Sequence, residues 1–391
     1  MKKEVVVALV GSGYGGYLHA TGYQRVSGIN VRLKYVVDKF DIEKAKVFAK
    51  TYGIENAIKD IDIVLNDPEV DVVDIVTPPS SHANLVMQIA KAGKNIICEK
   101  PLNGYFGEIG DTKPIGFVSK RKMYSAVLEN LEEIEQVIKE SGVKFMYAEN
   151  YVYSPNVLKS AEIIRRKKSK ILYMKGEESL KGSSSPVAGS WEQTGGGSLI
   201  RVGTHPLAGL LWLKQVEAKA RGEKIEVESV TANVGTVIPT LTDYERRHIS
   251  ASPIDVDDFA NVTITFTDKT KAVVLASDTV LGGTKNYVEI YANDTTLMCN
   301  ITPNDTMQSY LLDEDGIEDL QISEMLPSKL GWQKPFIVPE IIRGYTGELQ
   351  DFAECIAYNR EPLSNFKLAY DTMKVAYAAY LSSEEGVRID F

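Results

Sequence analysis

Three glycines follow a short apolar run at the start of the chain. Residues 5–10 form a continuous run rich in valine, which is typical of a strand buried on both faces of a parallel sheet. Gly11, Gly13 and Gly16 come directly after it and precede a helical pattern. Such glycines form a tight turn, let the backbone approach a pyrophosphate and let the helix pack on the strand. The spacing predicts a dinucleotide site here, with Tyr14 beside it; an ordinary glycine-rich turn is the alternative.

A carboxylate follows the second apolar run. Residues 31–37 predict a strand that ends at Asp38, about 20 residues beyond the glycines, where a carboxylate can accept hydrogen bonds from the ribose hydroxyls of a dinucleotide. Its negative charge would repel a 2′-phosphate, which favours NAD over NADP. Lys39 follows directly and could weaken that preference. We therefore expect NAD as the cofactor, with NADP possible.

Two further predicted strands end in short motifs, Thr77-Pro78 and Glu99-Lys100-Pro101. Ligands of open α/β sheets bind at the carboxyl ends of the strands. Thr77 and Pro78 could therefore line the cofactor, or the proline could simply end the strand. A lysine near a sheet core is costly without a task or a partner. Lys100 could handle the proton of a substrate hydroxyl, whereas a surface ion pair is the alternative.

The elements that position these motifs fall into two groups. Strands alternate with helices up to residue 147, which predicts an α/β domain with a doubly wound parallel sheet and an inserted loop at residues 102–123. Residues 148–391 carry strands of period two, which predicts an α+β substrate-binding and oligomerisation domain on an open, mostly antiparallel sheet. These strands are expected at residues 225–237, 259–267, 271–277 and 287–292. Two closing helices within residues 346–382 are expected to pack near the first domain.

The bulk composition excludes several classes of protein. The chain has 391 residues and a net charge of -9, which argues against nucleic acid or an anionic membrane as its main partner. No apolar run reaches the roughly 18 residues of a membrane span, so we expect no membrane partner and a cytoplasmic location. The three cysteines lie far apart and the four histidines are scattered, which predicts neither a disulfide framework nor a metal site.

Several motifs together resemble the Gfo/Idh/MocA oxidoreductases, the family of glucose–fructose oxidoreductase and inositol dehydrogenase. The resemblance extends over essentially the whole chain, and the residues that carry it are Gly11-x-Gly13-x-x-Gly16-x-x-His19-Ala20, Asp74 to Pro78 with His82, Glu99-Lys100-Pro101, Gly195-Gly196-Gly197 leading to His205, and residues 376–386. It implies a Rossmann domain and an NAD(P)-dependent oxidoreductase that acts on a hydroxyl carbon of a sugar, sugar derivative or polyol. It also implies a homo-oligomer, dimer or tetramer.

The resemblance assigns roles to particular residues. Lys100 and His205 are implied to be catalytic, and His82 and Glu99 to lie at the cofactor. His205 could otherwise be an ordinary histidine at a helix start. The family often has an aspartate four residues before this histidine, but Arg201 stands there. An arginine cannot accept a proton at neutral pH, although it could orient an anionic or oxygen-rich part of the substrate.

The remaining substrate contacts are expected after the last strand of the first sheet and in the glycine- and serine-rich stretch. Asn150, Tyr151, Tyr153 and Trp191 could bind hydroxyl edges and apolar faces of a sugar, or they could belong to the core. Two other functions share this fold. One is a redox-neutral, NAD-dependent glycosidase, and the other is a non-catalytic sensor of sugar and cofactor.

Overall fold

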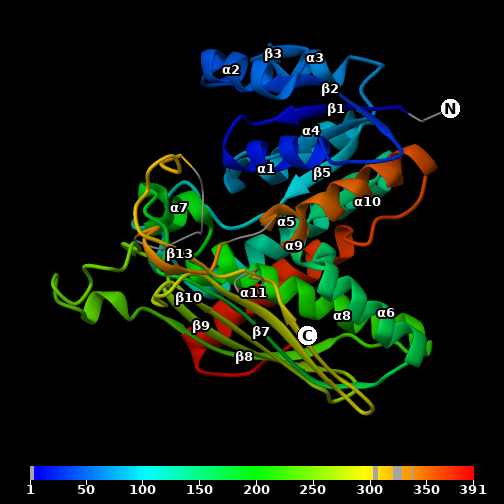
Figure 1. The fold of residues 1–391 in the computed structure, drawn as a ribbon. Coiled ribbons are helices and arrows are strands. Elements are labelled where there is room, and N and C mark those ends of the chain that lie inside the picture. Colours follow the sequence, from blue (N-terminus) through cyan, green and yellow to red (C-terminus); the bar gives the residue numbers. More distant parts are fainter. Residues whose placement is uncertain (1–3, 303–306, 320–327, 336–337) are drawn as a thin grey trace.

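The computed structural model describes residues 4–302, 307–319, 328–335 and 338–391. It contains two β-sheets with helices packed between them, as Figure 1 shows. The first sheet is built from the first 148 residues, and the second from strands between residue 171 and the C-terminus. No helix in the described ranges is both long enough and apolar enough to cross a membrane.

The first sheet is parallel throughout, as predicted. Its strands lie in the order β3-β2-β1-β4-β5-β6, so the chain order reverses between β1 and β4. In such sheets ligands bind at the carboxyl ends of the strands beside this reversal. The strands are β1 (Glu4–Val10), β2 (Asn30–Val37), β3 (Asn56–Ile58), β4 (Val72–Ile75), β5 (Asn95–Glu99) and β6 (Phe145–Ala148).

The helices of this part differ from the sequence pattern mainly at their ends. The long helix begins at Lys120, within the inserted loop that the sequence predicts at residues 102–123. The start of the long helix was misplaced because Arg121 and Lys122 are exposed and give no apolar periodicity. The helices are α1 (Tyr14–Tyr23), α2 (Ile42–Tyr52), α3 (Ile61–Leu65), α4 (His82–Lys91) and α5 (Lys120–Ser141).

The second sheet has the strand order β12-β11-β7-β10-β9-β8-β15. Neighbouring strands are antiparallel except β7 and β10, which run parallel, so the sheet is mixed but mostly antiparallel. The strands are β7 (Ile171–Ser179), β8 (Val227–Gly235), β9 (Phe259–Phe266), β10 (Lys271–Ser277), β11 (Lys285–Ala292), β12 (Thr296–Asn300) and β15 (Ile389–Asp390). A small separate hairpin pairs β13 (Ser309–Leu311) with β14 (Gly331–Gln333).

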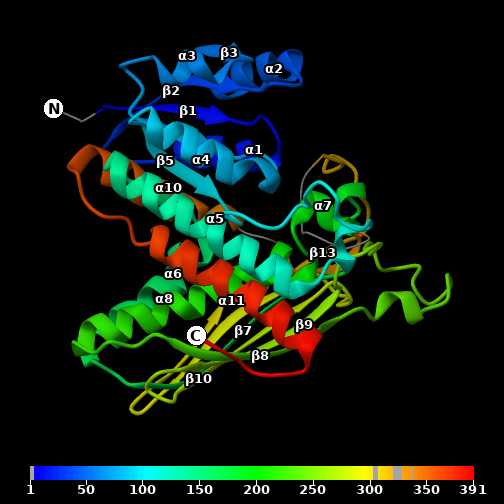
Figure 2. The same ribbon diagram turned by 180° about the vertical axis from the view of Figure 1, so that it is seen from behind.

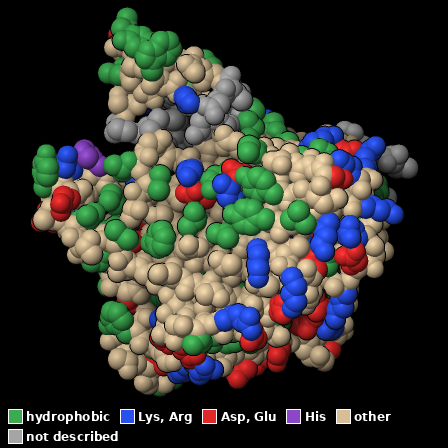
Figure 3. Space-filling view, turned by 90° about the horizontal axis from the view of Figure 1, so that it is seen from below, with side chains coloured by type: hydrophobic (Ala, Val, Ile, Leu, Met, Phe, Trp, Pro, Cys, Tyr) green, Lys and Arg blue, Asp and Glu red, His purple; other side chains and the backbone are tan. Residues whose placement is uncertain are grey.

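Helices cover one face of the second sheet and leave the other open. In Figure 2 the helices between the sheets lie against its upper face. The opposite face, on the side seen in Figure 3, mixes hydrophobic and charged side chains; Tyr173 stacks on Tyr291 there, and Lys175 pairs with Glu289 at 2.7 Å. The helices of this part are α6 (Pro155–Lys167), α7 (Trp191–Thr194), α8 (Thr204–Arg221), α9 (Pro339–Ile342), α10 (Tyr345–Tyr358) and α11 (Phe366–Glu385).

The two C-terminal helices return to the first sheet. Helix α10 packs on α1 so closely that a Cβ at Gly22 would lie 2.5 Å from Leu349 Cδ1. Before α11, the N–H of Tyr147 in β6 donates to the carbonyl of Ser364 at 3.0 Å. The Asn365 side chain then caps α11 by accepting from the N–H of Leu368. These contacts join the end of the chain to the strands that carry the candidate site.

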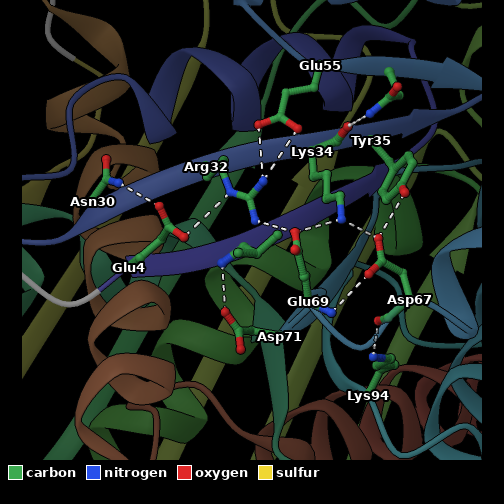
Figure 4. A network of polar contacts seen from close by, with 12 residues as sticks. Glu4, Asn30, Arg32, Lys34, Tyr35, Glu55, Asp67, Glu69, Asp71 and Lys94 are labelled. Carbon is green, nitrogen blue, oxygen red and sulfur yellow. Dashed lines mark hydrogen bonds and ion pairs between the residues drawn. The ribbon is translucent and has the colours of Figure 1, made fainter.

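A network of charges ties β2 to the segments before β3 and β4 (Figure 4). Arg32 pairs with Glu69 at 2.8 Å and with Glu55 at 3.3 Å, and Lys34 pairs with Asp67 at 2.6 Å. The hydrogen bond from Lys34 is the main reason that the pKa of Asp67 falls to about 2. The network lies at the amino ends of the strands, away from the glycine turn at their carboxyl ends, so it holds the sheet rather than a ligand.

Candidate active site

The glycine turn after β1 has the geometry that a pyrophosphate needs. Gly11 has a φ of +116°, and a Cβ there would lie 2.8 Å from the Val76 carbonyl oxygen. A Cβ at Gly16 would lie 2.8 Å from the carbonyl of Gly11, whereas one at Gly13 would meet nothing within 4 Å. Gly13 is the N-cap of α1 and offers no side-chain cap to its first N–H groups. The turn is therefore close-packed at Gly11 and Gly16 and open at Gly13, which leaves room for the phosphates of NAD.

Asp38 presents a carboxylate at the end of β2. Ser12 Oγ donates to its Oδ2 at 2.5 Å, and the N–H groups of Phe40 and Asp41 donate to its Oδ1 at 3.1 and 3.0 Å. Burial acts to raise the pKa of Asp38, but these hydrogen bonds outweigh it and hold the pKa below its usual value. An ionised acceptor therefore stands beside the glycine turn, as ribose hydroxyls require. Tyr14, at the start of α1, is 67 % exposed on the same side of the turn.

His82 joins the ends of β4 and β5. Its Nδ1 lies 2.7 Å from the carbonyl oxygen of Pro101, and its Nε2 lies 2.8 Å from the carbonyl oxygen of Thr77. The ring is buried, and this burial lowers the pKa of His82. Thr77 Oγ1 lies 2.6 Å from Ser81 Oγ, and Pro78 between them is exposed. His82 thus fixes the relative positions of the two strand ends that carry the predicted cofactor and lysine motifs.

Lys100 reaches across to the second part of the chain. Its Nζ donates to the carbonyl oxygen of Arg201. Arg201 lies in a π-helical turn, Leu199–Gly203, directly before α8. In such a turn each carbonyl accepts from the N–H five residues ahead. For the carbonyl of Arg201 that residue is Pro206, which has no N–H to donate. The sequence thus leaves a carbonyl for Lys100, four residues before His205.

Carboxylates gather around Lys100. Burial lowers the pKa of Lys100, while the charges of Glu99, Glu149 and Glu178 act to raise it and that of Arg201 to lower it. Three glutamates and one arginine therefore surround the lysine. The glutamates come from the ends of β5, β6 and β7, and the arginine comes from the π-helical turn. An ammonium whose pKa is lowered in this way can donate a hydrogen bond and give up or share a proton.

His205 is held by a buried acid. Its Nδ1 lies 2.7 Å from Glu149 Oε1, and Glu149 is fully buried directly after β6. The imidazole stacks on Tyr151 with ring centres 5.2 Å apart, and Tyr151 donates its hydroxyl to Glu178 at 2.7 Å. A carboxylate at Nδ1 fixes the tautomer and leaves Nε2 as the acceptor. The arrangement can therefore take a proton at Nε2 and stabilise the imidazolium that results.

Glu99 contacts a buried histidine, His19. His19 Nδ1 lies 2.8 Å from Asp74 Oδ2, its Nε2 lies 3.3 Å from Glu99 Oε1, and Tyr23 donates to Asp74 at 2.8 Å. Burial acts to lower the pKa of His19, but Asp74 and Glu99 outweigh it and raise the pKa well above its usual value. A positive imidazole thus lies behind Glu99 and favours its charged form beside Lys100.

Asp257 shapes the turn that leads to His205. Its carboxylate accepts from the N–H groups of Gly197 and Leu199 and from Ser198 Oγ, at 2.8 to 2.9 Å. A Cβ at Gly197 would lie 1.9 Å from the carbonyl oxygen of Asp257, so only glycine allows this approach. Asp255 and Asp258 likewise accept from backbone N–H groups. Among the residues that the structure describes, no group of three or more His, Cys, Asp or Glu side chains could hold a metal ion.

The structure brings some of the predicted site residues together and places others elsewhere. Tyr151, Arg201 and His205 lie around Lys100, as described above. Asn150 donates to the carbonyl of Arg343 at 2.9 Å, Tyr153 donates to Asp351 at 2.8 Å, and Trp191 donates its indole N–H to the carbonyl of Tyr105 at 3.0 Å. These three side chains are buried in contacts with the segment before α10, with α10 and with the insertion.

Three acids at the site were given no role from sequence. Glu149 follows β6 directly, and this position at a strand end is the signal that could have identified it. Glu178 lies on the same side of β7 as Gly176, whose Cβ would meet Pro206 of α8 at 2.9 Å. Asp278 follows β10 and pairs with Arg201 at 2.7 Å. The positions of Glu178 and Asp278 could not be predicted, because the side of β7 and β10 that points to the site depends on how the second sheet is assembled.

Two family models match the chain. Residues 5–111 match the oxidoreductase family described as an NAD-binding Rossmann fold, and residues 171–298 match the GFO/IDH/MocA C-terminal domain. Levoglucosan dehydrogenase of Pseudarthrobacter phenanthrenivorans is 26 % identical over 325 residues, which are 77 % of this chain and 75 % of that protein.

Solved structures share the fold over the whole chain. The structure of GenD2 from gentamicin A biosynthesis in complex with NAD has a TM-score of 0.78 at 21 % identity, covering 100 % of this chain and 97 % of that one. The complex of levoglucosan dehydrogenase with NADH and levoglucosan has a TM-score of 0.72 at 21 % identity and covers 99 % of both chains. Together with the two family models, this likeness identifies the chain as a member of the Gfo/Idh/MocA family, and thus as an NAD-binding oxidoreductase.

Proposed function

We propose that this protein is an NAD-dependent dehydrogenase that oxidises a hydroxyl carbon of a sugar, sugar derivative or polyol. The observation that carries the proposal is the contact of Lys100 Nζ with the carbonyl of Arg201, four residues before His205. It brings a lysine from the end of β5 and a histidine from α8, both suited to proton transfer, to one place. The relative named levoglucosan dehydrogenase supports a carbohydrate as the substrate.

His205, Glu149, Lys100 and Tyr151 each have a separate role in the proposed reaction. NAD, held at the glycine turn and at Asp38, would supply the acceptor for the hydride, which leaves the hydroxyl proton for the side chains to handle. His205 Nε2 takes the proton of the substrate hydroxyl, and Glu149, 2.7 Å from Nδ1, stabilises the imidazolium. The Lys100 ammonium donates to the same hydroxyl oxygen and stabilises its developing negative charge. Tyr151 holds the imidazole ring in plane by stacking on it.

The cofactor and substrate contacts are part of the proposal. The backbone N–H of Gly13, at the start of α1, would hold the pyrophosphate, and Asp38 would hold the adenosine ribose. Gly11, whose N–H donates to the carbonyl of Val37, forms the tight turn, and Gly16 lets α1 pack beneath it. The remaining proposed cofactor contacts come from Tyr14, Thr77, Pro78, His82, Glu99 and Lys100. Those proposed for the substrate come from Lys100, Tyr151, Arg201 and His205. The internal hydrogen bonds of Asn150, Tyr153 and Trp191 favour the alternative that these three side chains belong to the core.

The test is the absorbance of NADH when the purified chain is mixed with NAD and a panel of free sugars, inositols, sugar acids and aryl glycosides. NADH formation with a sugar or polyol supports the proposal. Release of the aglycone without net NADH would replace it with the redox-neutral glycosidase. Binding of cofactor and sugar without either product would replace it with a sensor.

We also propose a homo-oligomer in the cytoplasm, with residues 1–147 and 148–391 as its two domains. The open face of the second sheet, where Tyr173 and Tyr291 stack, is the surface that a second copy would cover. Light scattering measures the assembly; a monomer at micromolar concentration would refute it. Exposed aromatic side chains favour such a contact.

A further inference from the structure

Arg201 lies four residues before His205, and its charge is already paired. Its Nη1 donates to Asp278 Oδ2 at 2.7 Å, and the two side chains are only 16 % and 3 % exposed. Asp278 follows β10, and its own N–H donates to the carbonyl of Asp258 at 2.8 Å, which fixes the position of the carboxylate. Because little water screens the pair, the two charges largely cancel for any ligand that approaches.

The other charges of this region are mostly negative. Glu99, Glu149 and Glu178 act electrostatically on Lys100. Burial raises the pKa of Asp278, and Asp257 and Asp258 are near enough to raise it further against the opposing effect of Arg201. Among the described residues, the cations that act on these acids are Lys100, Arg201 and the imidazolium of His19 behind Glu99. A carboxylate or phosphate on the substrate would therefore enter a region with more negative than positive charge.

An unpaired arginine would instead favour the binding of an anionic substrate. The guanidinium presents donors in a planar fork that matches a carboxylate or a phosphate. If Arg201 were free, it would attract sugar acids to the position beside Lys100. Asp278 occupies one side of that fork and supplies the compensating charge. The other carboxylate oxygen of Asp278, Oδ1, is buried and accepts no hydrogen bond from the residues that the structure describes. The Asp278 side chain is therefore held in place chiefly by Arg201.

We propose that Asp278 is a specificity-determining residue, which neutralises Arg201 so that the pocket accepts uncharged carbohydrates and discriminates against sugar acids and sugar phosphates. This inference rests on the proposed function, because it assigns the pocket around Lys100 to a carbohydrate. It narrows the substrate class to neutral sugars and polyols.

The test compares neutral sugars with their matching acids. Isothermal titration of the full chain, saturated with NADH, measures the dissociation constants of D-glucose, D-glucuronate, D-galactose and D-galacturonate. The wild-type chain should bind the neutral member of a pair more tightly. Asp278→Asn should tighten the binding of an acid by about tenfold to a hundredfold, the worth of a hydrogen bond between charged groups. Glu289→Gln, which removes an acid from the open face of the second sheet, should change neither constant.

A second variant guards against damage to the fold. Removing Asp278 leaves Arg201 unpaired, which is costly inside a protein, so Arg201→Gln/Asp278→Asn removes both charges together. This double variant should not gain affinity for the acids. The inference is overturned if the wild-type chain binds the acids as tightly as the neutral sugars. It is also overturned if Asp278→Asn gains no more affinity for acids than Glu289→Gln does.

The outcomes separate this inference from the proposed function. If the chain forms NADH from a sugar acid in preference to its neutral partner, the inference falls while the dehydrogenase stands. If no sugar yields NADH but Asp278→Asn acquires binding of the acids, the inference stands and the dehydrogenase falls.

Discussion

Replacing Glu149 by glutamine tests the role given to His205. Glu149→Gln keeps the shape of the side chain and an oxygen that can accept from Nδ1, but it removes the negative charge 2.7 Å from the ring. Glu149 is fully buried, so solvent screens the pair little. Two unit charges about 4 Å apart at an effective dielectric constant of about 20 interact by about 4 kcal/mol. Each 1.4 kcal/mol or so is a factor of ten in rate, which gives an upper limit of about a thousandfold.

The retained hydrogen bond reduces this figure, so we expect kcat to fall by about a hundredfold to a thousandfold. The assay is the initial rate of NADH formation as a function of pH, together with the affinity for NADH measured by fluorescence. The affinity for NADH should stay unchanged, because Glu149 contacts the His205 ring and not the glycine turn. Glu162→Gln on α6, where the side chain is partly exposed and pairs with Lys159 and Arg166 far from His205 in the chain, is the matched control. A rate within about threefold of wild type, or a loss seen only as weaker NADH binding, would refute the assignment.

Four further outcomes are expected. Lys100→Met should lower kcat by about a hundredfold to ten-thousandfold, with a smaller loss of NADH affinity, as measured by stopped-flow and fluorescence; an unchanged rate would exclude Lys100 from the chemical step. Gly11→Ala should reduce the free energy of unfolding in urea by about 1–3 kcal/mol and weaken NADH binding, because its φ is +116° and the Val76 carbonyl lies 2.8 Å from the added Cβ. Asp38→Asn should raise the ratio of NADP to NAD in kcat/KM, and a fall in that ratio would contradict the role of its charge. The folded-state pKa of Asp67, about 2, lies below the ordinary value of about 4, so its stabilising effect is full above about pH 4 and is lost as the pH falls toward 2; Asp67→Asn should therefore flatten acid unfolding in that interval.

Local sequence signals predicted the first sheet and the motifs at its strand ends. Valine-rich runs, a glycine turn and helices of ordinary period lie close together in the chain, so the carboxyl ends of β1, β2, β4 and β5 could be placed by rule. Asp38 was assigned from such a position alone, whereas the catalytic role of Lys100 was implied by the family resemblance. The insertion at residues 102–123 was predicted as a loop, but its last residues belong to α5, because its polar first turn hides the start of that helix.

The partners of His205 and Arg201 could not be predicted in the same way. His205 meets Glu149 across 56 residues, and Arg201 meets Asp278 across 77. Such pairs depend on how the second sheet is ordered, and the parallel pairing of β7 with β10 breaks the antiparallel pattern that period-two strands indicate. The short edge strand β12 was also missed, because its five residues give too little periodicity.

A crystal structure of the chain with NADH and the best neutral substrate of the panel tests the central claim most directly. The hydroxyl oxygen on the reacting carbon should lie within about 3 Å of both Lys100 Nζ and His205 Nε2, with Glu149 still bound at Nδ1. A substrate whose reacting hydroxyl contacts neither side chain would contradict the assignment of this site.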